Sequence, residues 1–213
     1  MQQILVYSDS LSWGIVPSTR KRLAFLERWP GAMEDRLVRA GLSVRVIEDC
    51  LNGRRTVWED PFKPGRNGLT GLQQRIEIHS PLALVVLMLG TNDFQSMHDV
   101  NAWHSAQGSA ALVRAVRAAP IEPGMPVPPV LIVAPPAVGT PRGVIAPKFA
   151  GAAAKGEQLA AELEQVATEL GCAYFDAGKV VTTSMIDGVH LDPDQHLVLA
   201  TALAQRVAQL LDG

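Results

Sequence analysis

The sequence of 213 residues has little cysteine and no long apolar run. Two cysteines, Cys50 and Cys172, are too few for a disulfide framework, so we expect reduced thiols and a cytoplasmic protein. Only Met1, Gln2 and Gln3 precede the first apolar stretch, so we expect no secretory leader. The longest uninterrupted apolar run, residues 82–89, is too short to cross a bilayer, so we expect no membrane partner.

The chain also lacks a large basic cluster. Its formal net charge is -2, and the basic segments at residues 20–22 and 54–55 are short and isolated, as solvated loop charges are. Because nucleic-acid binding depends on a broad basic surface, we expect no nucleic-acid partner. A hydrophobic content of 47% and a charged content of 19% are ordinary for a globular protein. The length suits one α/β domain spanning residues 1–213.

Five apolar runs of strand length recur along the chain. They are continuous runs rich in aliphatic residues, without period-two alternation, which is typical of strands covered on both faces. The predicted strands are residues 4–7, 43–47, 82–89, 130–134 and 173–175.

Segments with helical spacing lie between these strands. The predicted helices are residues 32–39, 110–118, 158–170 and 195–211. Pro30 near the start of the first and Gly41 just beyond its end are typical of helix boundaries. Strands that alternate with helices predict right-handed crossovers and an α/β fold with three layers, α/β/α, around a five-stranded parallel sheet of flavodoxin-like order.

Three loops are longer than a simple connection requires: residues 49–68, 120–129 and 135–147. In an open parallel sheet, ligands bind outside the carboxyl ends of the strands, and long loops there commonly carry function. The proline-rich composition of these loops favours the rigid walls of a pocket over a mobile lid.

Ser8, Asp9 and Ser10 follow directly after the first predicted strand. We predict that Ser10 is a nucleophile, and a serine hydroxyl reacts readily only when a positioned base removes its proton. His190 lies in a turn-rich loop before the last helix, and Asp187, three residues earlier, could orient its ring. An Asp and His at this spacing also occur at ordinary capped helix starts.

The other four histidines fit ordinary positions better. His79 ends a helical segment, His98 and His104 lie in a polar stretch with no partner pattern nearby in the sequence, and His196 suits a surface or supporting position.

Two residues after other strands could stabilise a developing oxyanion. The Asn92 side chain has two N–H groups to donate, and Gly53 could bring its backbone N–H close to a substrate. Considered alone, Asn92 could equally cap a loop and Gly53 could be a plain turn glycine.

Together these segments resemble the four sequence blocks of the SGNH (GDSL-type) hydrolases. The blocks are Ser8-Asp9-Ser10-Leu11, Gly53, Gly90-Thr91-Asn92-Asp93 and Asp187-Gly188-Val189-His190. Within that family, the sequence most resembles the arylesterase/acyltransferase branch. The segments that carry this resemblance are Ser10-Leu11-Ser12-Trp13-Gly14, Arg28-Trp29, Leu89-Gly90-Thr91-Asn92-Asp93, Pro135-Pro136 and Phe175-Asp176-Ala177-Gly178.

The resemblance implies a serine esterase that acts on short-chain aryl or alkyl esters through an acyl-enzyme, with water or an alcohol as acceptor. Ser10 would be the nucleophile, His190 the base and Asp187 its orienting group. The oxyanion hole would consist of the Ser10 and Gly53 backbone N–H groups and the Asn92 side chain. The resemblance implies no metal and no organic cofactor, and it implies a homo-oligomer with interface candidates in the loops around Trp29 and Trp58.

One position departs from the family pattern, because Ser8 stands where the family has glycine. A positive φ at this position would strain a serine, whereas extended backbone would not. We expect Asp9 to support the nucleophile loop by accepting backbone N–H bonds. Trp13, Trp29 and Phe149 are candidate substrate-binding residues for the wall of an acyl pocket, although the two tryptophans fit core packing equally well.

Two alternatives use the same residues differently. Asp9, Asn92, Asp187 and His190 could hold a divalent metal for phosphoester hydrolysis, although Ser10 would then have no role. A flavodoxin-like binding module without catalysis is the other alternative, but the first loop lacks a glycine-rich phosphate cradle.

Overall fold

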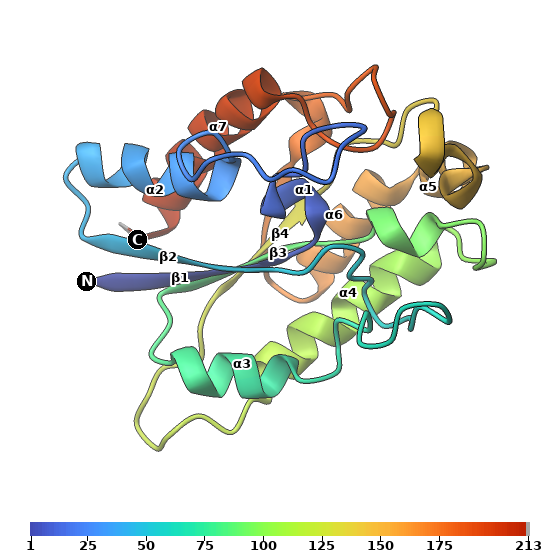
Figure 1. Cartoon of the computed structure of the whole chain (residues 1–213). Helices are drawn as coiled ribbons and strands as arrows, with labels where there is room; N and C mark the ends of the chain where they lie inside the picture. Colours follow the sequence, from blue (N-terminus) through green and yellow to red (C-terminus); the bar gives the residue numbers. More distant parts are fainter. Residues whose placement is uncertain (212–213) are drawn as a thin grey trace.

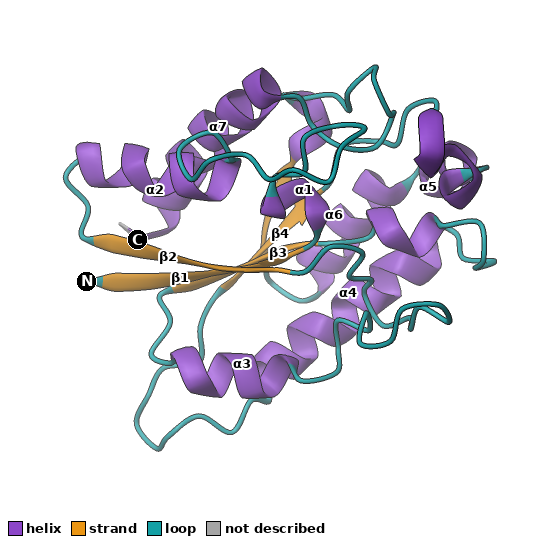
Figure 2. Ribbon diagram, in the orientation of Figure 1, coloured by secondary structure: helices purple, strands orange, loops and turns teal. Residues whose placement is uncertain are grey.

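A parallel five-stranded sheet forms the centre of the molecule (Figures 1 and 2). The computed structural model describes residues 1–211. The strands are β1 (Gln2–Ser8), β2 (Val44–Cys50), β3 (Leu84–Met88), β4 (Val130–Ala134) and β5 (Ala173–Asp176). They lie in the order β2-β1-β3-β4-β5, and every neighbouring pair is parallel, which confirms the predicted flavodoxin-like sheet.

Helices follow the strands and cover both faces of the sheet. The α-helices are α1 (Ser10–Trp13), α2 (Trp29–Arg39), α3 (Leu72–His79), α4 (Ala102–Arg117), α5 (Ala152–Gly156), α6 (Leu159–Glu169) and α7 (Pro193–Leu211). Short 3₁₀ helices are η1 (Thr91–Phe94), η2 (Gly143–Phe149) and η3 (Ala177–Lys179). None of the helices described within residues 1–211 is long and apolar enough to cross a membrane.

Successive side chains of β1 point into different cores. Ile4 and Val6 pack with α2 and α7 on one face of the sheet, whereas Leu5 and Tyr7 pack with α3, α4 and α6 on the other. Figure 1 shows α2 and α7 above the sheet and α3 and α4 below it. Burial on both faces is the reason that the strands lack period-two alternation.

Two helices begin earlier than the apolar pattern predicts. Helix α2 starts at Trp29, and Pro30 lies in its first turn, where a proline's missing N–H and fixed φ favour a helix start. Helix α4 starts at Ala102, where the Asn101 side chain accepts the backbone N–H of His104 and the His104 ring accepts that of Asn101. This capping pair satisfies two N–H groups of a helix end that the apolar periodicity does not reveal.

The loop at residues 120–129 is not where we expected it. It joins α4 to β4 and so lies at the amino ends of the strands, whereas residues 49–68 and 135–147 follow β2 and β4 at the carboxyl ends. Only the latter two loops contribute to the cavity described below.

The Trp29 side chain is part of the core, with 0% of its surface exposed and its indole N–H donating to Ser12 Oγ at 3.0 Å. We predict that Trp29→Ala lowers the free energy of unfolding by about 3–5 kcal/mol, because it leaves a large cavity and removes a buried hydrogen bond to Ser12 Oγ. Urea denaturation measures this loss.

Trp103, on the outside of α4, is the matched control because it is 54% exposed. The same substitution there should change the free energy of unfolding by less than about 1 kcal/mol. Equal losses at the two positions would contradict a core role for Trp29.

Candidate active site

Ser10 begins α1 at the carboxyl end of β1. Asp9 caps this short helix, since its Oδ1 accepts the backbone N–H of Leu11 at 2.9 Å, as expected. The helix ends at Gly14, whose φ of 83° lets the chain turn away. Ser10 is therefore held in a tight strand-to-helix turn, and it lines a cavity of about 520 Å³.

The His190 ring lies between Ser10 and Asp187. Its Nε2 is 3.2 Å from Ser10 Oγ, and its Nδ1 is 2.8 Å from Asp187 Oδ2. The contact with a carboxylate, which only accepts hydrogen bonds, places the ring proton on Nδ1 and leaves Nε2 free to accept the serine proton. The three predicted residues thus form one hydrogen-bonded chain.

Asp187 is held in its ionised form. Burial alone would raise the pKa of its carboxyl, but hydrogen bonds from the His190 ring and from the backbone N–H groups of His190 and Val189 outweigh burial. Both backbone donors lie 2.9 Å from Oδ1. These bonds hold the pKa of Asp187 well below its usual range, so the carboxylate can stabilise a protonated His190.

Ser18 is a supporting residue that the sequence analysis missed. Its backbone N–H donates to Asp187 Oδ2 at 3.2 Å, and its φ of 57° is the single positive value among non-glycine residues 1–211. Such a conformation is costly for serine and is retained at functional sites where surrounding contacts impose it. No local sequence pattern marks the position.

The loop at residues 135–147 anchors the turn that carries His190. The backbone N–H of Gly139 donates to Gly188 O at 2.8 Å, and that of Arg142 donates to Asp187 O at 3.0 Å. Gly188 has a φ of 76°, and a Cβ there would lie 2.2 Å from Thr140 O, so only glycine fits.

Asn92 follows β3 and lies beside the serine turn. Its Nδ2 donates to Asp9 Oδ2 at 2.8 Å and to Arg54 O at 3.2 Å. Both amide hydrogens are therefore engaged, as in the loop-capping alternative for Asn92. Burial raises the pKa of Asp9 to about 6 against the hydrogen bonds from Leu11 and Asn92.

Two residues that line the cavity have backbone N–H groups without a partner among the described residues. Ser10 and Gly53 both line the cavity, and within residues 1–211 neither N–H has a hydrogen-bond partner. Gly53 has a φ of 84°, which other residues rarely adopt. Gly53 is thus a turn glycine whose N–H is also available to a ligand.

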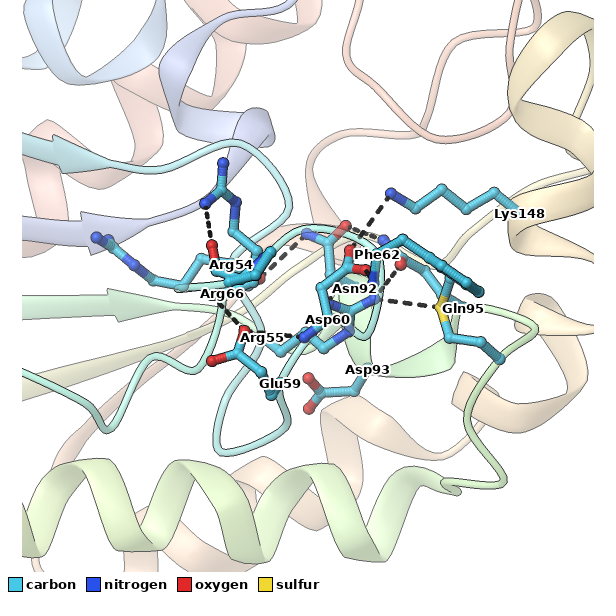
Figure 3. Close-up of polar contacts among 12 residues, drawn as sticks. Arg54, Arg55, Glu59, Asp60, Phe62, Arg66, Asn92, Asp93, Gln95 and Lys148 are labelled. Carbon is cyan, nitrogen blue, oxygen red and sulfur yellow. Dashed lines mark hydrogen bonds and ion pairs between the residues drawn. The ribbon is translucent and has the colours of Figure 1, made fainter.

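A buried polar network supports Asn92 from behind, as Figure 3 shows. Gln95 Nε2 donates to Asn92 Oδ1 at 2.7 Å, and Gln95 Oε1 accepts from the Arg55 guanidinium. Arg55 also forms an ion pair with Asp60, 3.1 Å apart. No local sequence pattern predicts that Gln95 or Asp60 belongs to the site.

The interpretation of residues 54–55 as solvated loop charges is wrong. Arg54 and Arg55 are only 5% and 0% exposed. Arg54 pairs with Asp49 at 2.6 Å and stacks over the Tyr7 ring. Charge alone could not distinguish these buried side chains from surface ones, since Tyr7 and Gln95, which pack against them, come from distant segments.

The expected roles of Trp13 and Trp29 in the pocket wall are wrong as well. Among the described residues, neither tryptophan lines the cavity. Trp29 is in the core, and the Trp13 ring packs under the Arg22 guanidinium instead. Phe149 does line the cavity, together with the apolar side chains of Ile15, Val144 and Ile145.

Ser8 fits its position without strain. It is the last residue of β1 and is not among the residues with positive φ. Its hydroxyl donates to Met88 O at 2.7 Å and lies 2.6 Å from Ser12 Oγ, instead of contacting Asp9. The departure from the family glycine therefore adds buried hydrogen bonds between β1, α1 and β3.

The metal-binding alternative does not fit the geometry. Within residues 1–211, no three His, Cys, Asp or Glu side chains come together in a way that could hold a metal ion. The oxygens of Asp9 and Asp187 accept hydrogen bonds from Leu11, Asn92, His190 and neighbouring backbone groups instead.

His196 is buried, so of its two predicted positions the surface one is wrong. Its Nδ1 accepts the backbone N–H of Trp29 at 3.3 Å. Burial, with smaller effects from His190 and Arg28, lowers the pKa of His196 to about 4. It is therefore a neutral supporting residue of α7 that contacts the start of α2. His79 ends α3 and His104 caps α4, so both histidines have structural positions at helix ends.

The family comparison agrees with these blocks. Residues 9–198 match the sequence model of the GDSL-like lipase/acylhydrolase family. No curated protein matches the chain significantly in sequence.

Solved esterases resemble the chain over its whole length. A carbohydrate acetylesterase from Sinorhizobium meliloti is 33% identical, with a TM-score of 0.93 over 99% of this chain and 100% of that chain. The aryl esterase of M. smegmatis is 34% identical, with the same TM-score and coverage. A lipase/acylhydrolase from Enterococcus faecalis, 15% identical with a TM-score of 0.68 over 98% of this chain and 96% of that one, shares the fold.

Asp93 is a buried carboxylate behind the site whose ionisation should make the stability of the fold depend on pH. Its carboxylate accepts hydrogen bonds from Thr56 N, Thr56 Oγ1 and Ser105 Oγ at 2.6–2.9 Å. Burial raises its pKa from 3.8 to about 6 despite these bonds. Protonation of Asp93 therefore stabilises the fold below pH 3.8, and this contribution is lost as the pH rises through about 6.

We predict that Asp93→Asn removes this pH dependence. Between pH 4 and 7, the wild type should lose roughly 2–3 kcal/mol more unfolding free energy than the variant. Chemical denaturation at several pH values measures both slopes, and equal slopes would contradict the raised pKa.

Proposed function

This chain belongs to the GDSL-like lipase/acylhydrolase family, and we propose that it is a serine esterase that cleaves short-chain aryl or alkyl esters through an acyl-enzyme. The observation that carries the proposal is the chain of hydrogen bonds from Ser10 through His190 to Asp187, open to a cavity of about 520 Å³.

In the proposed reaction, Ser10 Oγ attacks the ester carbonyl while His190 Nε2 takes the hydroxyl proton. Asp187 stabilises the resulting imidazolium through Nδ1. The tetrahedral intermediate then collapses, the bond to the leaving alcohol breaks, and His190 returns the proton to that alcohol. Water repeats these steps on the acyl-enzyme and releases the acid.

The oxyanion would accept hydrogen bonds from the free N–H groups of Ser10 and Gly53. The third donor is the Asn92 amide, whose hydrogens are both engaged in the resting site. Of the two hydrogen bonds that Asn92 Nδ2 donates, the one to Arg54 O is the longer, at 3.2 Å. We expect the oxyanion to take the place of Arg54 O as acceptor, while the bond to Asp9 keeps the amide in position.

Apolar residues beside Ser10 support a small acyl group as the substrate. Ile15, Ile145 and Phe149 line the same cavity, and Phe149 is only 2% exposed. Phe149 keeps the substrate-binding role predicted for it, whereas the aliphatic residues replace Trp13 and Trp29.

The finer expectations of the sequence analysis belong to the same proposal. Residues 1–213 would form one domain, which a single sheet with cores on both faces supports. The cysteines Cys50 and Cys172 are both free thiols, which supports a cytoplasmic location. Acyl transfer to alcohols and a homo-oligomer rest on the resemblance to the acyltransferase branch.

We predict that Ser10→Ala lowers kcat for a short-chain aryl ester by about 10⁴-fold or more, because the nucleophile is lost. Hydrolysis of 4-nitrophenyl acetate measures the effect. The control is Ser12→Ala, whose hydroxyl contacts Ser8 and Trp29 in the core. It should leave activity within about tenfold.

A fluorophosphonate probe extends this test to the binding-module alternative. Stoichiometric labelling at Ser10 is expected for an activated serine. Absence of labelling, or Ser10→Ala activity within about tenfold of the wild type, would contradict the nucleophile assignment.

We predict that removing Asn92 lowers kcat more than removing Gln95, which supports it from behind. Asn92→Ala should lower kcat by about 10²–10³, because an oxyanion donor is lost. Gln95→Leu should lower kcat by about 3–10-fold, because Asn92 Oδ1 loses the donor that fixes the amide.

Both effects should fall on kcat and leave KM nearly unchanged, since the oxyanion forms only after substrate binding. A change in KM alone at Gln95 would indicate substrate contact in place of positioning. Circular dichroism checks that each variant is folded.

A further inference from the structure

Four cationic side chains gather around the cavity that contains Ser10: Arg20, Lys63, Arg142 and Lys148. They come from the segment after α1, from the loop at residues 49–68 and from the region of η2. The chain as a whole carries a formal net charge of -2, so this concentration is local.

The two carboxylates of the cavity are already engaged. Asp187 is bonded to His190. Asp60, only 3% exposed, accepts the Phe62 backbone N–H at 2.9 Å and pairs with the fully buried Arg55 at 3.1 Å. Because Arg55 neutralises Asp60 from behind, the cavity lining keeps an excess of positive charge.

The cations themselves lack close partners. Within residues 1–211, the side chains of Arg20, Lys63 and Arg142 form no hydrogen bond or ion pair with another residue. Lys148 Nζ lies 4.0 Å from Asp60, which is too long for a hydrogen bond, and Figure 3 shows it reaching toward that carboxylate.

A bound anion would stabilise the charged form of the Lys148 side chain. Its side chain is partly buried, and burial lowers its pKa; the charges of Arg55, Lys63 and Arg20 lower it further, against the effect of Asp60. Cations that depress one another's protonation in this way gain most from an incoming negative charge.

We propose that this basic rim binds an anionic group of the substrate, so that the preferred substrates are esters that also carry a carboxylate or a phosphate. This inference rests on the proposed esterase function of Ser10. The apolar wall formed by Ile15, Ile145 and Phe149 would hold the uncharged part of the ester while the rim holds the anion.

The test compares matched charged and neutral esters. One arm uses 4-acetoxybenzoate and its methyl ester, which differ in a carboxylate on the alcohol side. The other arm uses 4-nitrophenyl hemisuccinate and 4-nitrophenyl butyrate, in which the carboxylate is on the acyl side. We expect kcat/KM to favour the anionic member of at least one pair by about tenfold at low salt. Added NaCl should reduce the preference, because salt screens exposed charges.

Charge-removing variants connect the preference to the rim. The ratio of kcat/KM for the anionic to the neutral ester should fall by about 3–10-fold in Lys148→Gln or Arg142→Gln. Lys21→Gln is the matched control, because Lys21 is exposed and adjacent to Arg20 but does not line the cavity. Its ratio should equal that of the wild type.

The possible failures are distinguishable. Hydrolysis that depends on Ser10 but shows no anionic preference in either pair would overturn the substrate inference alone. A preference that Lys21→Gln and Lys148→Gln reduce equally would also overturn it, since long-range charge would then suffice. Hydrolysis of either ester that persists in Ser10→Ala would overturn the proposed function instead.

Discussion

The site depends on the carboxylate of Asp187 more than on any other single group. It accepts four hydrogen bonds, from the backbone N–H groups of Ser18, Val189 and His190 and from the His190 ring. Three of these donors are backbone groups, whose positions are fixed by the turn at residues 187–190 and by the strained conformation of Ser18. A carboxylate held in this way stays ionised and orients the imidazole toward Ser10.

The remainder of the site is built at the expense of stability near neutral pH. Asp9 and Asp93 are buried with pKa values raised to about 6, so ionising them as the pH rises weakens the fold. Each carboxylate nevertheless holds a loop of the site: Asp9 ties Asn92 to the serine turn, and Asp93 ties Thr56 to α4. Functional sites commonly retain such locally unfavourable groups.

The sequence was informative where the signal is local or shared by a family. Continuous apolar runs predicted the five strands, and their alternation with helices predicted the flavodoxin-like order. The resemblance of four sequence blocks to those of a known family predicted the family, which the match to residues 9–198 confirms. The catalytic roles of Ser10, Asp187 and His190 stay predictions, although the geometry brings all three together. Composition could not reveal that Arg55 is buried or that Trp29 faces the core, because both depend on contacts between distant segments.

Arg55 shows why such contacts matter for function. Its guanidinium contacts Gln95, which fixes the Asn92 amide, and it also pairs with Asp60, the carboxylate on the wall of the cavity. In the proposed enzyme, the same buried charge therefore supports the oxyanion donor and keeps the cavity rim positive. Replacing Arg55 would leave Asp60 and Gln95 without their buried partner, so rate and substrate preference would change together. The Lys148 side chain lies 4.0 Å from Asp60 and forms no hydrogen bond with Gln95 or Asn92, so its removal separates the two effects.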